Sequence, residues 1–295
     1  MAAELQHTVI RSATKAITIG GDQPFCIIGE RINPTGRPKF QAQLRAGDLS
    51  QIETDVLAQV AGGATMLDVN MGIPLVDEAE LLAKTITMVQ GLTDLPLVID
   101  SSVVEALEAG LGAYQGKALV NSVTGEKERL EAILPIVARH GAAVIALPNE
   151  EDEIPDDPYK RLDITKKIVD IATGEYGIPL EDIVIDPLAM PIGADTTLVT
   201  KTLQTIQLIH DELGLNMTLG ASNVSFGMPG RHALGATFLP MAMRCGLTSA
   251  IMDVRSPQIV EAIKAADLLL GNDEWGMAWI ARARAAAAAA AEKSA

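Results

Sequence analysis

The chain has 295 residues, of which 48% are apolar and 21% are charged, and its formal net charge is −15. This composition is typical of a globular protein with a substantial core. The negative charge excludes the extended basic surface that binding to nucleic acid or to an anionic membrane requires.

The sequence predicts neither a membrane span nor a secretory signal. It has no run of about 18 apolar residues, and residues 1–15 lack the apolar stretch of a signal peptide. Its two cysteines, Cys26 and Cys245, lie in apolar runs without a CxxC partner, and its four histidines show no ligand spacing. We therefore expect reduced thiols, no metal site and a cytoplasmic location.

The first 24 residues precede the repeated pattern that dominates the chain. Residues 8–24 contain two short β-like runs and a Gly-Gly pair. They predict an N-terminal extension, residues 1–24, folded as a hairpin that covers one end of the main domain.

Residues 25–280 repeat one pattern, in which a short apolar run precedes a segment with helical character. Segments 49–60, 81–89, 129–140 and 198–213 keep apolar residues on one helical face. The repeat predicts an α/β fold, a (β/α)8 TIM barrel of the pterin-binding type once the resemblance below is added. An open doubly wound sheet would favour GxGxxG after its first strand, where this chain has GERINPTGR. The predicted strands are 25–29, 65–69, 96–100, 118–121, 143–147, 183–186, 217–221 and 249–253.

Residues 281–295 form an alanine-rich segment with charged ends. Alanine has the highest intrinsic helix propensity. This segment therefore predicts a C-terminal helix or tail outside the barrel, without a role in the site.

Most of the predicted strands end in a carboxylate or an amide. An unpaired carboxylate buried in a strand costs several kcal/mol, so these groups have no local use in a core. The carboxyl ends of the strands of such a barrel form its functional mouth. The polar residues that we expect there are Glu30, Arg31, Asn33, Asp68, Asn70, Asp100, Asn121, Asp186, Asn223 and Asp253.

The set is rich in Asp and Asn and poor in His and Lys. A carboxylate accepts two parallel hydrogen bonds from an N–H/NH2 edge, and an amide both donates and accepts. A 2-amino-4-oxo pteridine ring presents such an edge. A nucleophilic enzyme needs a base beside Ser, Cys or Lys. A sugar hydrolase uses paired carboxylates and leaves the amides unexplained.

Several of these residues also have local interpretations. Asp and Asn are favoured at helix N-caps, and neighbouring opposite charges form ion pairs without any function. The local alternatives are helix capping by Asp68 and Asn70, a helix cap by Asp100 at Ser101–Ser102, a turn at Asp186–Pro187, an ion pair between Asp253 and Arg255, and a Glu30–Arg31 pair that braces the first loop.

Six motifs occur in a fixed order: GERINPTG, LDVN, IDSS, NSVTGE, IDPL and GASNVSFGMP. Together they resemble the pterin-binding methyltransferases, in particular the methyltetrahydrofolate:corrinoid/iron–sulfur protein methyltransferase family. The folate module of cobalamin-dependent methionine synthase is a more distant likeness. The resemblance runs from about residue 25 to about residue 275, in register with all eight predicted strands.

The resemblance implies that Asp100, Asn121 and Asp186 contact the pterin and that Asn223 lies near its N5 atom. Asn223 and Asp100 are the expected catalytic residues, because N5 must gain a proton when its methyl group leaves. Asp68 and Asn70, at the end of the second predicted strand, are added to these four residues. The expected pterin-binding set is therefore Asp68, Asn70, Asp100, Asn121, Asp186 and Asn223.

Arg231 falls where the family has an arginine, and a guanidinium there suits the glutamate tail of folate. Ser222 and Phe226 complete the expected tail-binding group. Phe226 stands where the resembling enzymes carry a glutamine that contacts the folate. One polar contact is therefore expected to be lost.

The reaction implied is methyl transfer between N5 of tetrahydrofolate and the cobalt of a corrinoid, with the direction undetermined. The chain has no DxHxxG corrinoid-binding pattern, so the cobalamin is expected on a partner. In the resembling family that partner is a corrinoid/iron–sulfur protein. The family also implies a homodimer, with tetrahydrofolate or 5-methyltetrahydrofolate as substrate and no bound metal.

Three alternatives remain at this point. A corrinoid methyltransferase with a quaternary amine as methyl donor is the first, because the aromatic Phe226 suits an ammonium group. A pterin-condensing enzyme of the dihydropteroate synthase type would favour a basic residue where this chain has GASN. A non-catalytic pterin-binding barrel would bind folate without turnover.

Overall fold

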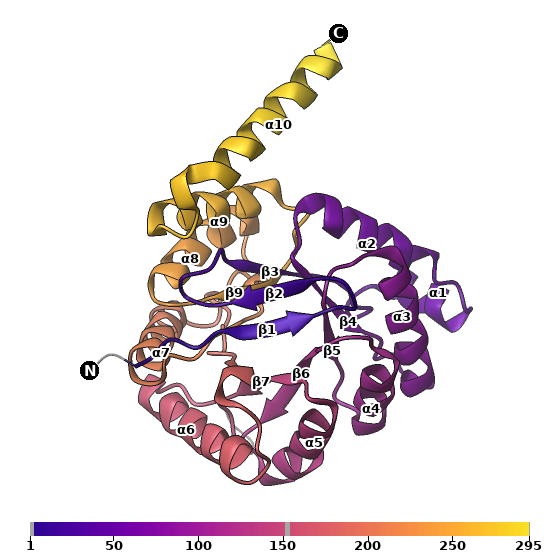
Figure 1. The fold of residues 1–295 in the computed structure, drawn as a ribbon, viewed down its shortest axis with the longest axis vertical. Helices are drawn as coiled ribbons and strands as arrows, with labels where there is room; N and C mark the ends of the chain where they lie inside the picture. Colours follow the sequence, from indigo (N-terminus) through magenta and orange to yellow (C-terminus); the bar gives the residue numbers. More distant parts are fainter. Residues whose placement is uncertain (1–2, 151–153, 295) are drawn as a thin grey trace.

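A computed structural model describes residues 3–150 and 154–294 of the chain. Within those residues, seven parallel strands form a curled sheet in the order β8-β7-β6-β5-β4-β3-β9, and helices surround it (Figure 1). The strands are β3 (Cys26–Ile32), β4 (Met66–Asn70), β5 (Leu97–Asp100), β6 (Leu119–Thr124), β7 (Ala143–Leu147), β8 (Ile183–Ile185) and β9 (Ser249–Met252).

The helices follow the apolar periodicity of the sequence, and α7 coincides with the predicted segment 198–213. The helices are α1 (Pro38–Arg45), α2 (Ser50–Gly62), α3 (Glu78–Leu92), α4 (Val104–Ala113), α5 (Lys127–His140), α6 (Pro158–Gly174), α7 (Leu198–Leu213), α8 (Arg231–Arg244), α9 (Pro257–Leu270) and α10 (Met277–Ser294). Three short 3-10 helices are described besides, η1 (Leu180–Asp182), η2 (Ala221–Asn223) and η3 (Glu274–Gly276).

The seventh predicted strand, residues 217–221, is wrong as a continuous strand. The segment instead makes isolated parallel bridges, Met217 with Ile185 and Gly220 with Ile251. The Thr248 hydroxyl accepts a hydrogen bond from the backbone N–H of Met217 at 3.0 Å, and η2 begins at Ala221. A regular ladder of strand hydrogen bonds therefore cannot extend along residues 217–221. Four backbone hydrogen bonds of 2.9 Å still join this segment to β8 and β9 and close the barrel.

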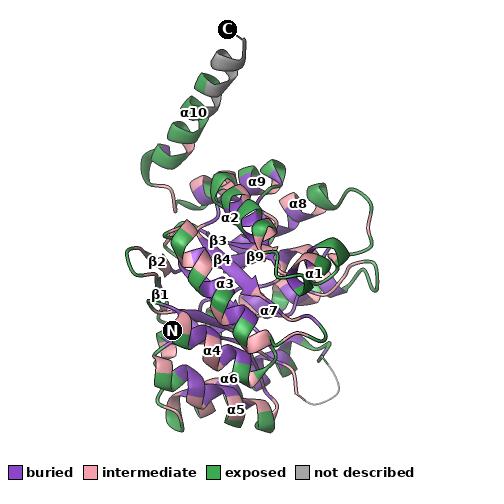
Figure 2. Ribbon diagram, turned by 90° about the vertical axis from the view of Figure 1, so that its right-hand side faces the viewer, coloured by how far each residue is buried: buried purple, intermediate pink, exposed green. Residues whose placement is uncertain are grey.

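Side chains point alternately to the two faces of each strand, and this alternation divides the core into two regions. In β5, Leu97 and Ile99 face the helices, whereas Val98 points into the barrel with Met66, Leu119 and other buried apolar residues. Successive side chains of a strand point to opposite faces. Figure 2 shows the buried residues gathered along the strands and on the inner sides of the helices.

The N-terminal residues form the predicted hairpin, with β1 (Thr8–Arg11) antiparallel to β2 (Ala16–Ile19). Ile10 and Ile19 are fully buried against the apolar residues at the start of the barrel strands. Asn216 ties the hairpin to the barrel, because its Nδ2 lies 3.0 Å from the Gln6 carbonyl, 3.0 Å from the Thr8 hydroxyl and 2.9 Å from the Ile19 carbonyl. The hairpin therefore seals the amino-terminal end of the barrel and leaves the carboxyl ends of the strands for the site.

Helix α10 projects from the body of the protein beyond α9 (Figure 1). Several apolar side chains near its start are exposed, among them Trp275 at 85% and Met277 at 67%. Among the described residues, no helix combines the length and the apolar character needed to cross a membrane.

Asn216→Ala is expected to lower the free energy of unfolding by about 2–3 kcal/mol, because it leaves buried hydrogen-bonding groups of the hairpin without a partner. Urea denaturation followed by circular dichroism measures the change. Gln207→Ala is the control, since Gln207 pairs with Asp211 on the exposed face of α7. Equal midpoints for the two variants would contradict the sealing role of the hairpin contact.

Candidate active site at the mouth of the barrel

Polar side chains follow the inward-facing apolar residues of the strands at a spacing of two. Val98 is followed inward by Asp100, Leu119 by Asn121, and Val184 by Asp186. The strand register then places Asn70 beside Asp100, and Asp100 beside Asn121. These residues therefore share one end of the barrel interior, as predicted from their positions at the strand ends.

Asp68 is the most deeply buried of these carboxyl groups, with 2% of its surface exposed. The Asn121 amide donates to its Oδ1 at 3.3 Å. Burial, followed by the negative charge of Asp100, raises the pKa of Asp68 well above its usual value, and Glu30 adds to the effect. The helix-capping alternative fails for Asp68 and Asn70, because Asp77 caps α3.

Asp100 titrates near neutral pH. Burial and, to a smaller extent, the charge of Glu78 raise its pKa to about 6, against the opposing effect of a hydrogen bond from Asn70. The Ser101 hydroxyl donates to Glu78 and accepts from the backbone N–H of Val103 at 2.9 Å. The start of α4 is therefore held by Ser101, and the Asp100 carboxyl remains available at the mouth.

Asp186 directly follows β8, and its Oδ1 accepts the Leu188 backbone N–H at 2.8 Å. Burial raises the pKa of Asp186 to about 6, against the opposing effects of that hydrogen bond and of the nearby Arg161 charge. This carboxyl and Asp100 therefore both change protonation close to neutral pH.

Arg161 is a residue of the site that the sequence reasoning missed. Its side chain is fully buried in α6 and donates to the carbonyls of Pro155 at 2.6 Å, Pro187 at 2.9 Å and Leu188 at 3.1 Å. It thereby holds the turn after Asp186, where Leu188 has a φ of +62° that side chains rarely adopt. The signal was a charged residue at the same helical spacing as the buried Leu162, Thr165 and Ile168.

The other side of the mouth is a loop that carries the remaining predicted residues. Asn223 is exposed in η2, and its amide lies against Gly220, where an added Cβ would meet Nδ2 at 2.9 Å. Arg231 donates from Nη2 to the Ser222 carbonyl at 2.7 Å and lies 5.9 Å from the Phe226 ring, which is 67% exposed. The structure thus places Asn223 on a loop, whereas Asp68, Asp100 and Asp186 lie on or directly after barrel strands.

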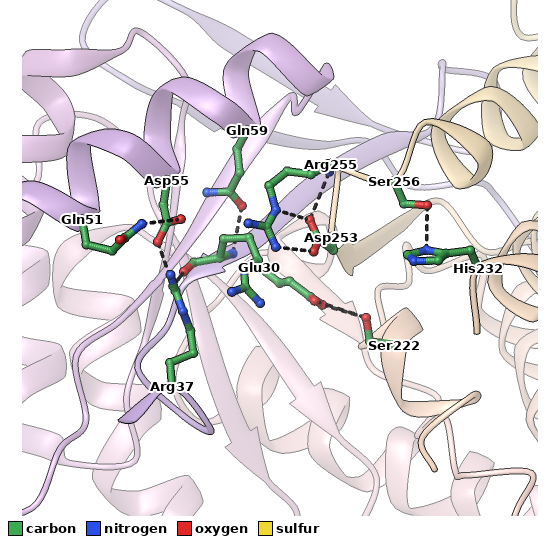
Figure 3. A network of polar contacts seen from close by, with 11 residues as sticks. Glu30, Arg37, Gln51, Asp55, Gln59, Ser222, His232, Asp253, Arg255 and Ser256 are labelled. Carbon is green, nitrogen blue, oxygen red and sulfur yellow. Dashed lines mark hydrogen bonds and ion pairs between the residues drawn. The ribbon is translucent and has the colours of Figure 1, made fainter. Parts of the chain in front are cut away.

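A polar network joins this loop to the first and last barrel strands (Figure 3). The Ser222 hydroxyl lies 3.2 and 3.0 Å from the two oxygens of Glu30. Arg255 forks onto Asp253 at 2.9 and 2.7 Å, so the local ion-pair interpretation of Asp253 is correct. Although burial opposes the shift, the hydrogen bonds from Arg255 hold the pKa of Asp253 below its usual value.

The predicted Glu30–Arg31 pair is wrong. Among the described residues no Glu30–Arg31 contact meets the 4.0 Å limit of an ion pair, and the Arg31 backbone N–H binds Gln59 at 2.8 Å. Glu30 and Arg31 instead line a cavity of about 220 Å³, together with Ser222, Arg231, His232 and Asp253. In residues 3–150 and 154–294, no group of three His, Cys, Asp or Glu side chains is arranged to hold a metal ion.

Comparison with known families gives a match to the pterin binding enzymes over residues 29–253. The chain belongs to this family. A methylcorrinoid:tetrahydrofolate methyltransferase of Eubacterium limosum is 32% identical to this pterin-binding enzyme over 250 residues, covering 84% of the chain and 92% of the relative. A methionine synthase of Mycobacterium tuberculosis is 29% identical over 255 residues, covering 82% of the chain and 21% of the relative.

Solved structures of dihydropteroate synthases share the fold. The enzyme of Xanthomonas albilineans with 4-aminobenzoic acid superposes with a TM-score of 0.66 at 19% identity, covering 89% of this chain and 98% of that one. A Yersinia pestis enzyme with a pterine-sulfa conjugate gives 0.66 at 17% identity, with the same coverage. The barrel architecture predicted from the strand repeat is thereby confirmed, and the family match above confirms its pterin-binding type, which the motif resemblance implied.

Asp186→Asn is expected to stabilise the ligand-free protein at pH 7.5 by on the order of 2 kcal/mol, since one pKa unit corresponds to about 1.4 kcal/mol. The raised pKa means that ionisation of Asp186 opposes folding. The stability linked to the protonated carboxyl is complete below pH 4 and is lost as the pH rises through about 6.

Unfolding midpoints of wild type and Asp186→Asn between pH 4.5 and 7.5 measure this difference, which is expected to grow with pH. Asp195→Asn is the control, because Asp195 is an exposed carboxyl with a lowered pKa. A difference that stays constant across the range would contradict the shifted titration of Asp186.

Proposed function

We propose that this protein transfers a methyl group between N5 of tetrahydrofolate and the cobalt of a corrinoid carried by another protein. The observation that carries the proposal is the 32% identity to the methylcorrinoid:tetrahydrofolate methyltransferase, which extends over 92% of that enzyme. The Asp and Asn residues at the mouth of the barrel support it, because their chemistry matches a pterin ring.

In this proposal the strand-end side of the mouth binds the pterin. Asp186 accepts from the N–H/NH2 edge of the ring, while Asn121 both donates and accepts. Asp100 and Asn70 contact the neighbouring edge, and Asp68 lies beneath with its link to Asn121. Arg231, Ser222 and Phe226 are on the opposite loop, where the tail of folate leaves the barrel.

Transfer from folate breaks the bond between the methyl carbon and N5, leaves the electron pair on N5, and forms a carbon–cobalt bond with the electron pair of cob(I)alamin. N5 must gain a proton, because N5 is an amine nitrogen and leaves poorly as an anion. Asp100 holds a proton up to a pH of about 6 and is suited to exchange it through water. Asn223 donates its amide hydrogen to N5, and the reverse reaction uses the same groups.

The corrinoid partner approaches from above the exposed loop of Asn223, Phe226 and Gly227. A corrinoid/iron–sulfur protein is the partner class that the sequence motifs suggest. We propose in addition a homodimer, supported by the exposed Trp275 and Met277 near α10. A cytoplasmic location is supported by the free thiols of Cys26 and Cys245.

Titration with 5-methyltetrahydrofolate tests the proposal. We expect micromolar-range binding by the wild type, which Asp186→Ala abolishes by removing the acceptor for the pterin edge. Asn223→Ala is expected to slow methyl transfer to cob(I)alamin by about 10²-fold, the typical contribution of a donor to developing charge. The exposed Glu131→Gln serves as the control. Absence of folate binding by the wild type would overturn the proposal.

The quaternary-amine alternative depends on Phe226, whose exposed ring faces the Arg231 guanidinium at 5.9 Å. We expect Phe226→Gln to strengthen binding of 5-methyltetrahydrofolate by about tenfold or less, since one polar contact is worth about 1 kcal/mol. Glycine betaine with cob(I)alamin is expected to give no transfer in either protein. Methylation of cob(I)alamin by betaine that Phe226→Gln abolishes would favour the alternative.

A further inference from the structure

Glu30 lies near the carboxyl end of β3, two residues before its last residue, and its side chain points toward Ser222 (Figure 3). Both of its carboxyl oxygens lie within hydrogen-bond distance of the Ser222 hydroxyl, at 3.2 and 3.0 Å. Ser222 directly precedes Asn223, and 192 positions of sequence separate it from Glu30. The contact therefore joins one side of the mouth to the other.

The Glu30 carboxyl has no ion-pair partner within 4.0 Å among the described residues. Arg255 forks onto Asp253, Arg37 pairs with Asp55 at 2.7 Å, and Arg231 donates to the Ser222 carbonyl, whereas Arg31 acts on Glu30 only from beyond ion-pair distance. Burial raises the pKa of Glu30, in keeping with a carboxyl that no cation contacts directly. Such a group is unfavourable for folding. Its contact with Ser222 is therefore better explained by a function than by a gain in stability.

The Glu30 side chain does not serve to hold the first loop in place. The backbone of Arg31 is held by Gln59, which accepts its N–H at 2.8 Å, and by Arg37, which donates to its carbonyl at 2.5 Å. The Glu30 side chain takes part in neither contact. Its described hydrogen-bond partner is Ser222 on the opposite loop.

Ser222 is held from two directions. Glu30 holds its side chain, and Arg231 donates to its carbonyl at 2.7 Å. Two residues further on, the Val224 carbonyl accepts the Ile192 N–H at 2.9 Å. Asn223 stands between these anchors with an exposed side chain, so the position of its amide over the mouth depends on them.

We propose that Glu30 is a positioning residue, which acts through Ser222 to set the placement of the Asn223 amide over the pterin. The inference rests on the proposed function, because it assigns to Asn223 a role in methyl transfer. The charged groups around Glu30 are Arg31 on its own strand, Asp68 on β4, Arg231 on α8 and Asp253 after β9. Among the described hydrogen bonds, none of these four side chains contacts the Ser222 hydroxyl, the group that carries the proposal.

Glu30→Ala, Ser222→Ala and the double variant test the proposal with 5-methyltetrahydrofolate and cob(I)alamin. We expect each single variant to lower kcat by about ten- to a hundredfold, because misplacement of a reacting group has effects of this size. In Glu30→Ala the Kd for folate is expected to change by less than about threefold, since the strand-end residues remain in place, whereas Ser222→Ala, which alters the tail-binding loop, is compared by its kcat alone. The double variant should match the worse single variant, because one contact is lost in all three.

Glu30→Gln is the conservative variant, because its amide oxygen still accepts a hydrogen bond from the Ser222 hydroxyl while the charge is removed. It is expected to recover most of the rate lost in Glu30→Ala. The exposed Glu131→Gln is the matched control and should behave as wild type. Hydrogen exchange of residues 221–226 in the ligand-free protein is expected to rise in Glu30→Ala and Ser222→Ala, and not in the control.

Wild-type rates and unchanged exchange in Glu30→Ala would overturn the positioning role. A large rise in Kd with unchanged kcat would also overturn it, because Glu30 would then contact the ligand itself. If the wild type neither binds folate nor transfers methyl, the proposed function fails and takes this inference with it. If the wild type is active and Glu30→Ala is equally active, the inference alone fails.

Discussion

The pleat of the parallel strands is the constraint on which the rest of this structure depends. Each inward-facing position lies two residues from the next, so a polar residue placed two after a buried apolar one must face the same interior. Val98 and Asp100 show this on β5, and Leu119 and Asn121 show it on β6. One end of the barrel interior is therefore apolar and the other is polar, and the closed parallel register brings the polar residues together.

The two ends of the barrel have opposite energetic roles. At the amino-terminal end, Ile10 and Ile19 of the hairpin remove apolar surface from water, which stabilises the fold. At the carboxyl end, Asp68, Asp100 and Asp186 are withdrawn from water without direct cation partners in the described structure, and their pKa values rise. Carboxyl groups in this state oppose folding, and they are also the groups that bind a polar ring edge and exchange a proton near neutral pH.

The mouth combines a rigid side with a less constrained one. Strand hydrogen bonds fix Asp100 and Asn121, and Arg161 holds the turn after Asp186 through backbone carbonyls. Asn223 instead is the exposed residue of a short 3-10 turn, anchored through Ser222 and Val224. A site divided in this way binds a flat ligand on preorganised groups. In the proposed function, the loop that carries Asn223 then acts in the methyl-transfer step, when the large corrinoid partner must approach.

Local pattern by itself determined the helix periodicity, the strand repeat and the polar strand ends, because each depends on residues within a few positions of one another. The tertiary structure decided the rest. Thr248 interrupts the ladder of the seventh predicted strand from 31 positions away. Arg161 reaches Pro187 across 26 positions, and Glu30 meets Ser222 across 192. Periodicity shows which face of an element is buried, but contacts between distant side chains arise only when the closed barrel brings their elements together.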